Sequence, residues 1–123
     1  MAAALATLDV LQADDSAAMR HMQAMGERLC AGISAQALRH GFSVTVSGPP
    51  AMPFVTFDAD DGVPATRPLA MAWCAAVARG GAWVHPFHNW YLSLSHTEED
   101  IDEALAATDA AFAHVASTHP CPS

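Results

Sequence analysis

Lysine is absent from this chain of 123 residues, and positive charge is scarce. Five basic residues face thirteen acidic ones, which gives a formal net charge of −8 at pH 7. Without lysine, no side chain can form an internal Schiff base with a carbonyl cofactor, and a phosphate-binding loop lysine is excluded. The few positive charges are scattered and form no basic patch for nucleic acid or anionic lipid. They are Arg20, Arg28, Arg39, Arg67 and Arg79.

Long apolar runs, targeting signals and paired cysteines are missing as well. No run of about 18 apolar residues occurs, so we expect no membrane-spanning helix. The start, MAAALATLDVLQADD, lacks the basic region of a secretory signal and carries acids that a transit peptide avoids. Cys30, Cys74 and Cys121 are odd in number and far apart, which indicates reduced thiols rather than disulfides or a zinc ribbon. These features predict a cytoplasmic protein.

Two helices are expected at the start of one compact domain. Residues 2–12 carry leucines at a spacing of three but no capping residue before them, which suggests that the chain begins inside a longer element. Asp14, Asp15 and Ser16 are expected to cap a second helix that runs to His40. A stripe on one face of that helix is typical of core or interface packing. Its members are Met19, Met22, Met25, Leu29, Ile33 and Ala37.

The rest of the chain alternates strand and helix signals. Alternating apolar residues predict strands at 42–46 and 54–57, and further strand segments are expected at 82–84 and 90–94. Pro68 begins a predicted helix that ends at Arg79, and Thr97 begins another with Asp100 completing a capping box. The order ααββαββα predicts an α+β fold in which helices pack on a small sheet of about three to four strands.

Two stretches resemble a known family. The segment WVHPFHNWYLSLSHTEEDIDEALAATDAAFAHV resembles the C-terminus of class III pyridoxal-phosphate (PLP) aminotransferases, in the glutamate-1-semialdehyde 2,1-aminomutase-like branch. The segments MAAALATLDVL, MRHMQAMGERLCAGI and VSGPPAMPFVTFD are similar to the part of the same proteins just upstream. The resemblance covers nearly the whole chain, and the joint order of these segments, with SHTEEDID leading into an amphipathic helix, argues against a chance match.

The resemblance implies that residues 1–123 are one C-terminal small domain. Residues 1–15 would then be the remnant of a linker helix from a missing large cofactor domain. The longer parent enzyme would use PLP to transfer an amino group, and the family implies a homodimer. This chain would hold no cofactor and no catalytic residue, because the lysine that bonds PLP is absent.

The segment HPFHN at 85–89 holds the candidate site. Related aminotransferases often have RPxGN here, and the arginine can bind a substrate carboxylate. By that match His85 stands in the place of arginine, Pro86 and Asn89 are kept, and His88 replaces glycine. A neutral imidazole is a weaker carboxylate partner than a guanidinium group. We expect His85, His88 and Asn89 to line the rim of the substrate entrance; alternatively, they only fix a kinked strand.

Metal binding and hydrolysis are alternative chemistries for the same region. His85, His88 and His96 with Glu99 could suggest a metal site, but histidines three apart outside a helix are not a specific metal pattern. Ser93 or Ser95, with His96 and Asp100, could suggest a hydrolase triad, yet no GxSxG motif is present and helix capping explains the acidic residues. No metal site is therefore predicted.

A second function class remains open from the sequence. The chain could be a stand-alone interaction module derived from such an enzyme, which forms a homodimer through the apolar stripe on the helix at 16–40. An independent small enzyme would need a nucleophile or metal site that the sequence does not offer.

Overall fold

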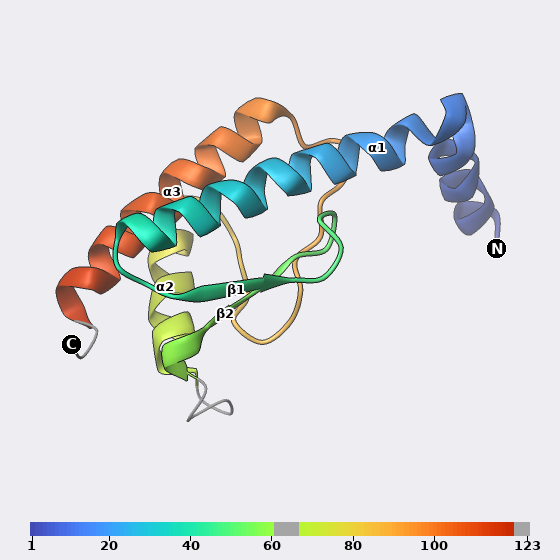
Figure 1. The fold of residues 1–123 in the computed structure, drawn as a ribbon. Helices are drawn as coiled ribbons and strands as arrows, with labels where there is room; N and C mark the ends of the chain where they lie inside the picture. The colour runs from blue at the N-terminus through green and yellow to red at the C-terminus, as the bar shows by residue number, and fades with distance from the viewer. Residues whose placement is uncertain (61–66, 120–123) are drawn as a thin grey trace.

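The described residues form three α-helices and one β-hairpin. The computed structural model describes residues 1–60 and 67–119. The elements follow in the order α1 (Ala2–Arg39), β1 (Val44–Ser47), β2 (Phe54–Phe57), the 3-10 helix η1 (Asp58–Asp60), α2 (Pro68–Arg79) and α3 (Glu98–Thr118) (Figure 1). Strands β1 and β2 are antiparallel, with Val44 opposite Phe57 and Ser47 opposite Phe54. The predicted α+β class is confirmed.

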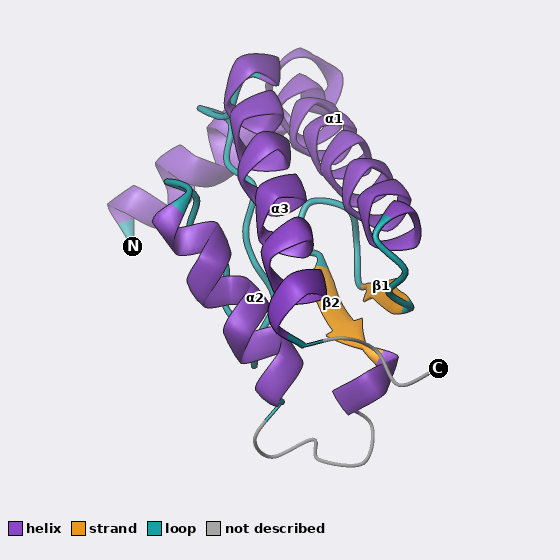
Figure 2. Ribbon diagram, turned by 90° about the vertical axis from the view of Figure 1, so that its left-hand side faces the viewer, coloured by secondary structure: helices purple, strands orange, loops and turns teal. Residues whose placement is uncertain are grey.

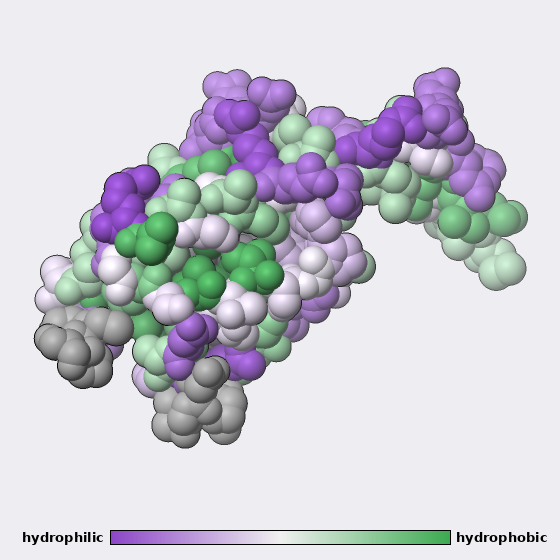
Figure 3. Space-filling view, viewed as in Figure 1, coloured by the Kyte–Doolittle hydropathy of each residue, from purple (hydrophilic) through white to green (hydrophobic). Residues whose placement is uncertain are grey.

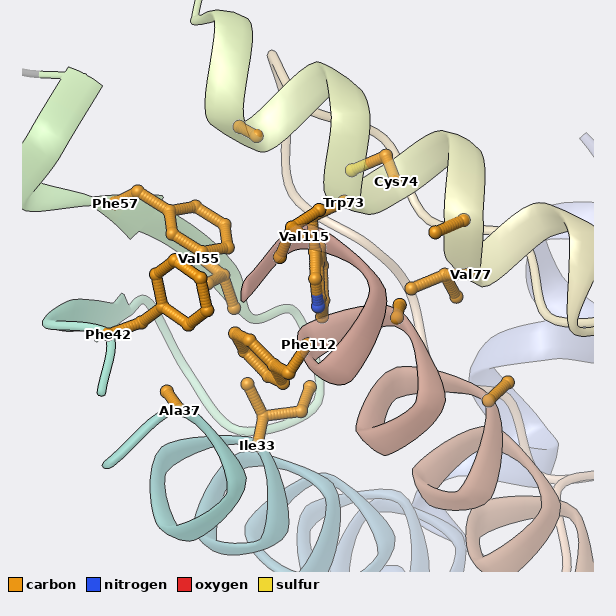
Figure 4. Packing of buried hydrophobic residues seen from close by; sticks show 14 of the residues in the cluster. Ile33, Ala37, Phe42, Val55, Phe57, Trp73, Cys74, Val77, Phe112 and Val115 are labelled. Carbon is orange, nitrogen blue, oxygen red and sulfur yellow. The ribbon is translucent and has the colours of Figure 1, made fainter. Parts of the chain in front are cut away.

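Helix α3 packs against both other helices, and the hairpin covers the remaining side of the core. Strand β1 contacts α1, whereas β2 contacts α2 (Figure 2). Phe112 on α3 is completely buried at the centre of this arrangement. Its ring centroid lies 5.1 Å from that of Trp73, 5.8 Å from Phe42 and 5.9 Å from Phe57 (Figure 4). These large aromatic rings come from α2, α3, β2 and the connection after α1, and their close packing contributes to stability beyond the area that they bury.

The break expected near residue 14 is present as a kink inside α1. Ala13 is extended, and Asp14, Asp15 and Ser16 have left-handed backbone conformations with φ between 50° and 61°. The expected role of these residues as an N-terminal cap is therefore wrong, because a capping residue has extended backbone angles. The Arg20 guanidinium instead donates hydrogen bonds to the Asp14 and Asp15 carbonyl oxygens.

The part of α1 before the kink, residues 2–12, projects from the body as a helical arm (Figure 1). Its apolar side chains Leu5, Leu8 and Val10 are each at least half exposed. The space-filling view shows apolar residues gathered at the end of this arm (Figure 3). No helix within residues 1–60 and 67–119 has both the length and the apolar character to cross a membrane.

The strands expected at 82–84 and 90–94 do not form, so the described sheet has two strands instead of three to four. The segment is extended, but only two backbone bonds attach it to the residues before β2. Trp90 N donates to the Pro53 oxygen and Leu92 N to the Ala51 oxygen, each at 2.9 Å. The bend at 86–88 separates these bonds from residues 82–84, so no continuous ladder is made.

Helices α2 and α3 begin as predicted. Pro68 occupies the first turn of α2, and Thr97 and Asp100 form the capping box of α3. The buried Asp60 carboxylate adds a cap that we did not predict, because it accepts hydrogen bonds from Leu69 N at 3.1 Å and Ala70 N at 2.9 Å. Residues 61–66, between η1 and α2, lie outside the described residues.

Burial of the methionine, tryptophan and cysteine side chains differs with their position in the fold. Met25 is buried, whereas Met19 at the start of the stripe is half exposed. Trp73 and Trp90 lie in the core, while Trp83 is 82% exposed. Cys30 and Cys74 are free thiols, and burial raises the pKa of Cys74 to about 12. Cys121 lies outside the described residues.

Candidate functional site

Residues 85–89 form a bend, called here the histidine turn, between the end of α2 and the start of α3. Its backbone is held at two points. The Trp90 indole Nε1 donates to the His85 oxygen at 2.9 Å, and Trp90 N donates to the Pro53 oxygen. Pro86 is buried beneath the bend, whereas the Phe87 side chain is exposed. The turn is therefore a fixed part of the domain surface.

The structure brings the two histidines of the turn together. The rings of His85 and His88 stack with centroids 3.8 Å apart and planes 11° apart. Phe87 N donates to His85 Nδ1 at 3.2 Å, and His88 Nδ1 lies 2.9 Å from the Asn89 oxygen. His85 and Asn89 are half-buried and His88 is exposed. All three predicted residues thus share one surface, although Asn89 contributes its backbone oxygen to the contacts seen here.

An arginine that the sequence did not indicate also reaches the histidine turn. Arg67 Nη1 donates to the Pro86 oxygen at 3.5 Å. The Arg67 guanidinium carbon lies 5.0 Å from the Phe54 ring centroid and 6.0 Å from that of Phe87. A guanidinium over aromatic rings makes a favourable cation–π contact. Residues 67 and 86 are brought together only by tertiary folding, and no sequence pattern relates them.

Ser93, His96 and Asp100 do not form a hydrolase triad. His96 Nδ1 accepts a hydrogen bond from Ser93 N at 2.8 Å, with Ser93 Oγ 3.1 Å away. The Asp100 carboxylate is occupied by the capping box, where Thr97 N and Thr97 Oγ1 each lie 2.8 Å from Oδ2. These bonds lower the pKa of Asp100. Capping, as predicted, explains the acidic residue.

The metal interpretation of the histidines gains no support from the geometry. Within residues 1–60 and 67–119, no three His, Cys, Asp or Glu side chains are grouped closely enough to hold a metal ion. His96 is directed to Ser93 rather than to the stacked pair, and its own carbonyl oxygen lies 2.6 Å from His21 Nε2.

A cavity of about 360 Å³ lies beside the histidine turn but does not include its three predicted residues. It is bounded by α1, the first half of α3, residues 80–84 and residues 90–92. Leu29, Ile33 and Trp90 give it an apolar wall, and Asp100 and Glu103 stand among its polar residues. No sequence pattern indicates this cavity, because its walls come from segments that lie far apart in the chain.

Known aminotransferases resemble this chain in sequence and in structure. No protein-family model matches the chain. An aminopentol aminotransferase from Sphingopyxis macrogoltabida is 43% identical over 99% of this chain and 28% of its own length. The chain is homologous to one part of an aminotransferase. A 3-aminobutyryl-CoA aminotransferase from Cloacimonas acidaminovorans (strain Evry) is 26% identical over 92% of this chain and 27% of its own length.

A solved relative has the same architecture. The FumI protein of Sphingopyxis sp. MTA144, in its PLP internal aldimine form, matches 98% of this chain with a TM-score of 0.84 and 37% identity. The match takes up 28% of the FumI chain. This aminotransferase homologue therefore spans little more than a quarter of the length of the relatives that it matches.

The residues of this chain do not fit a covalent PLP site. All five basic residues are arginine, so no lysine amine is present to bond the cofactor. The histidine turn offers imidazoles and one guanidinium, which make hydrogen bonds but provide no primary amine to bond an aldehyde. No chemical step through PLP is therefore assigned to these residues.

Proposed function

We propose that this chain acts as the C-terminal small domain of a PLP-dependent aminotransferase and contributes to substrate binding. Residues 1–123 would form the domain, and residues 1–15 would belong to the helix that links it to a large cofactor domain. The observation that carries the proposal is the match of nearly the whole chain to one part of aminotransferases, in both sequence and structure. In the longer enzyme, PLP would supply the amino-group transfer chemistry.

We also propose a subfamily and an oligomeric state for the parent enzyme. We propose, from the resemblance of residues 83–115, that the parent belongs to class III, in the glutamate-1-semialdehyde 2,1-aminomutase-like branch. The exposed arm with Leu5, Leu8 and Val10 supports an interface with further protein, and we propose that the parent is a homodimer. The cytoplasmic location expected from the sequence stays a prediction.

The histidine turn is the proposed rim of the substrate entrance. His85 and His88 are held by backbone contacts, and Arg67 joins them from a different part of the chain. Polar groups that are fixed before the substrate arrives bind it without a further loss of side-chain freedom. The substrates named for the two relatives, an aminopentol and 3-aminobutyryl-CoA, are both candidates for the substrate class of the parent.

A chimeric enzyme tests the proposal. The segment of the Sphingopyxis macrogoltabida aminotransferase that matches this chain is replaced with residues 1–123, and transamination is measured with saturating PLP. We expect turnover, because the chain shares 43% identity with the segment that it replaces. A folded chimera without turnover would contradict the proposed function.

Substitution of His85 in the active chimera tests the proposed rim. His85→Ala should raise the KM for the amine, because the ring lies at the proposed entrance. His114→Ala, on the exposed surface of α3, is the matched control and should leave KM unchanged. An unaltered KM in His85→Ala would remove the turn from the substrate site.

A further inference from the structure

The extended segment that follows the histidine turn has one bonded edge and one unpaired edge. Trp90 N donates to the Pro53 oxygen and Leu92 N to the Ala51 oxygen, each at 2.9 Å. Alternate residues of an extended chain direct their backbone groups to the same edge, so those of Tyr91 face the opposite edge, called here the Tyr91 edge. Neither Tyr91 N nor its carbonyl oxygen forms a hydrogen bond with another described residue.

Side-chain burial along this segment alternates as in a strand. Tyr91 is 67% exposed, whereas its neighbours Trp90 and Leu92 are buried and half-buried. Trp83, in the preceding extended stretch, is 82% exposed. Large aromatic side chains that stay exposed often mark an interaction surface. An unpaired strand edge with such side chains beside it is a template for pairing with another strand.

The cavity of about 360 Å³ adjoins the Tyr91 edge. Trp83 and Tyr91 belong to its lining, together with Leu29 and Ile33 from α1. A strand that paired with the Tyr91 edge would direct every second side chain to the same face. Apolar side chains at those alternate positions would therefore fit against the apolar wall of the cavity.

The charge of the cavity lining restricts what can pair with this edge. The lining contains the acidic residues Asp100 and Glu103, and no arginine is found among its described members. A basic side chain is complementary to these carboxylates. A second copy fits less well, because symmetric pairing through the same edge would bring Asp100 and Glu103 of both copies together. The charges thus favour a different segment that carries a basic residue.

We propose that the Tyr91 edge pairs with an extended segment from the rest of the parent enzyme. This inference rests on the proposed function and describes that segment: alternate apolar residues face the cavity, and a basic residue lies near Glu103. The chain matches 28% of the length of the aminopentol aminotransferase, so most of such a parent is available to supply the segment. Backbone hydrogen bonds to Tyr91 provide affinity, and the cavity selects the side chains.

Hydrogen exchange of the Tyr91 amide tests the pairing. The full 123-residue chain is compared with the chimeric enzyme, and peptide fragmentation after exchange gives the rates of single amides. The Tyr91 amide should exchange about tenfold more slowly in the chimera, because it gains a hydrogen bond there. Equal Tyr91 rates in the two proteins would overturn the proposal.

Two substitutions of Tyr91 separate backbone pairing from simple cover by other protein. Tyr91→Pro removes the outward N–H group, and Tyr91→Phe keeps it as the matched control. The two variants should have similar urea midpoints in the 123-residue chain, where this edge contacts water. In the chimera, Tyr91→Pro should unfold at a lower urea concentration than Tyr91→Phe. The same difference in both proteins would show that Tyr91 N makes no bond in the chimera.

Glu103→Lys tests the charge of the partner segment, with Glu99→Lys on the same helix but outside the cavity lining as the matched control. Glu103→Lys should speed exchange of the Tyr91 amide in the chimera about two- to fivefold, because it places like charges together. Glu99→Lys should leave that rate unchanged. Equal rates in both variants would overturn the basic partner. If Tyr91→Pro does not fold, this comparison decides.

Turnover of the chimera is recorded separately from exchange. An active chimera whose Tyr91 amide exchanges as in the isolated chain would overturn the pairing and leave the proposed function in place. Slow Tyr91 exchange in an inactive chimera would support the pairing, and the proposed function would then fail by itself. Protection of Tyr91 that rises with the concentration of the isolated chain would assign the edge to a second copy and overturn the proposal.

Discussion

The Asp109 carboxylate on α3 accepts a hydrogen bond from the His40 ring at the end of α1, with Nε2 and Oδ1 2.8 Å apart. The Arg39 guanidinium reaches the same oxygen at 2.6 Å, so one carboxylate joins the last residues of α1 to α3. The hydrogen bond from His40 is the largest cause of a lowered Asp109 pKa, and the contacts with Arg39 add to it. This cluster fixes the end of α1 against α3, next to the stacked rings of His40 and Phe112.

Asp109 should make stability depend on acid pH. Its pKa is lower in the folded chain than in the unfolded one, where it is about 3.9. Its contribution is therefore complete above the unfolded pKa and is lost as the pH falls through the folded pKa. Asp109→Asn should cost about 0.5–1 kcal/mol at pH 7, as expected for a half-exposed pair. Urea unfolding at pH 7 and pH 3 should show a smaller difference between the two proteins at pH 3.

Asp9→Asn on the exposed arm is the control for Asp109, and it should leave the unfolding free energy unchanged at pH 7. A difference between wild type and Asp109→Asn that grows toward pH 3 would contradict the assignment.

Removal of the Asp60 cap should destabilise the domain. Its two oxygens accept hydrogen bonds from Leu69 N and Ala70 N in the first turn of α2, where backbone donors have no helical partner. Asp60→Ala should cost about 1–2 kcal/mol, the usual value of a helix cap. Thermal unfolding of Asp60→Ala and Asp9→Ala measures the difference, and equal midpoints would show that the cap contributes nothing.

Substitution by alanine should affect stability in opposite ways at two glycines of α1. A Cβ at Gly26 would lie 1.9 Å from the Pro50 backbone oxygen, so Gly26→Ala forces α1 and the turn before β2 apart. At Gly32 the nearest atoms belong to the flexible end of Leu105, which can move aside. Gly26→Ala should lose about 1–3 kcal/mol, whereas Gly32→Ala should be neutral or gain up to about 1 kcal/mol of helix propensity. Denaturant unfolding compares them; equal stabilities would contradict the close approach.

The apolar arm should mediate association. Leu5 and Leu8 are 57% and 50% exposed on a helix that projects from the body. Burial of such side chains against a second copy would be favourable by roughly 25 cal/mol for each Å² removed from water. Sedimentation should show a dimer that the double variant Leu5→Ser, Leu8→Ser converts to monomer. Met71→Ser, on the exposed side of α2, is the control, and a wild-type monomer at high concentration would disprove the interface.

Local signals in the sequence predicted the helices and the hairpin well. Pro68, the Thr97–Asp100 capping box and the alternation of 54–57 act over a few residues, and each element forms where its signal lies. Gly41 follows α1 with a left-handed φ of 81°, as expected after a helix end.

Apart from the local cap expected at residues 14–16, the errors concern contacts between distant segments. Residues 82–84 and 90–94 have strand-like composition, but strand formation needs a partner with free backbone groups. Within the described residues, the segment before β2 offers them bonds only at Pro53 and Ala51. Similarly, the sequence placed His85 and His88 at one site but could not show the stacking of their rings. Arg67 was missed because its contact with Pro86 exists only in the folded chain.

The mass of the native polypeptide in the source cells tests the central claim most directly, namely that this chain works as one domain of a longer aminotransferase. An antibody against the chain should detect a band three to four times larger than 12.9 kDa, since the chain matches only 28% of its relative's length. A single band at 12.9 kDa would contradict the claim and would favour the stand-alone interaction module.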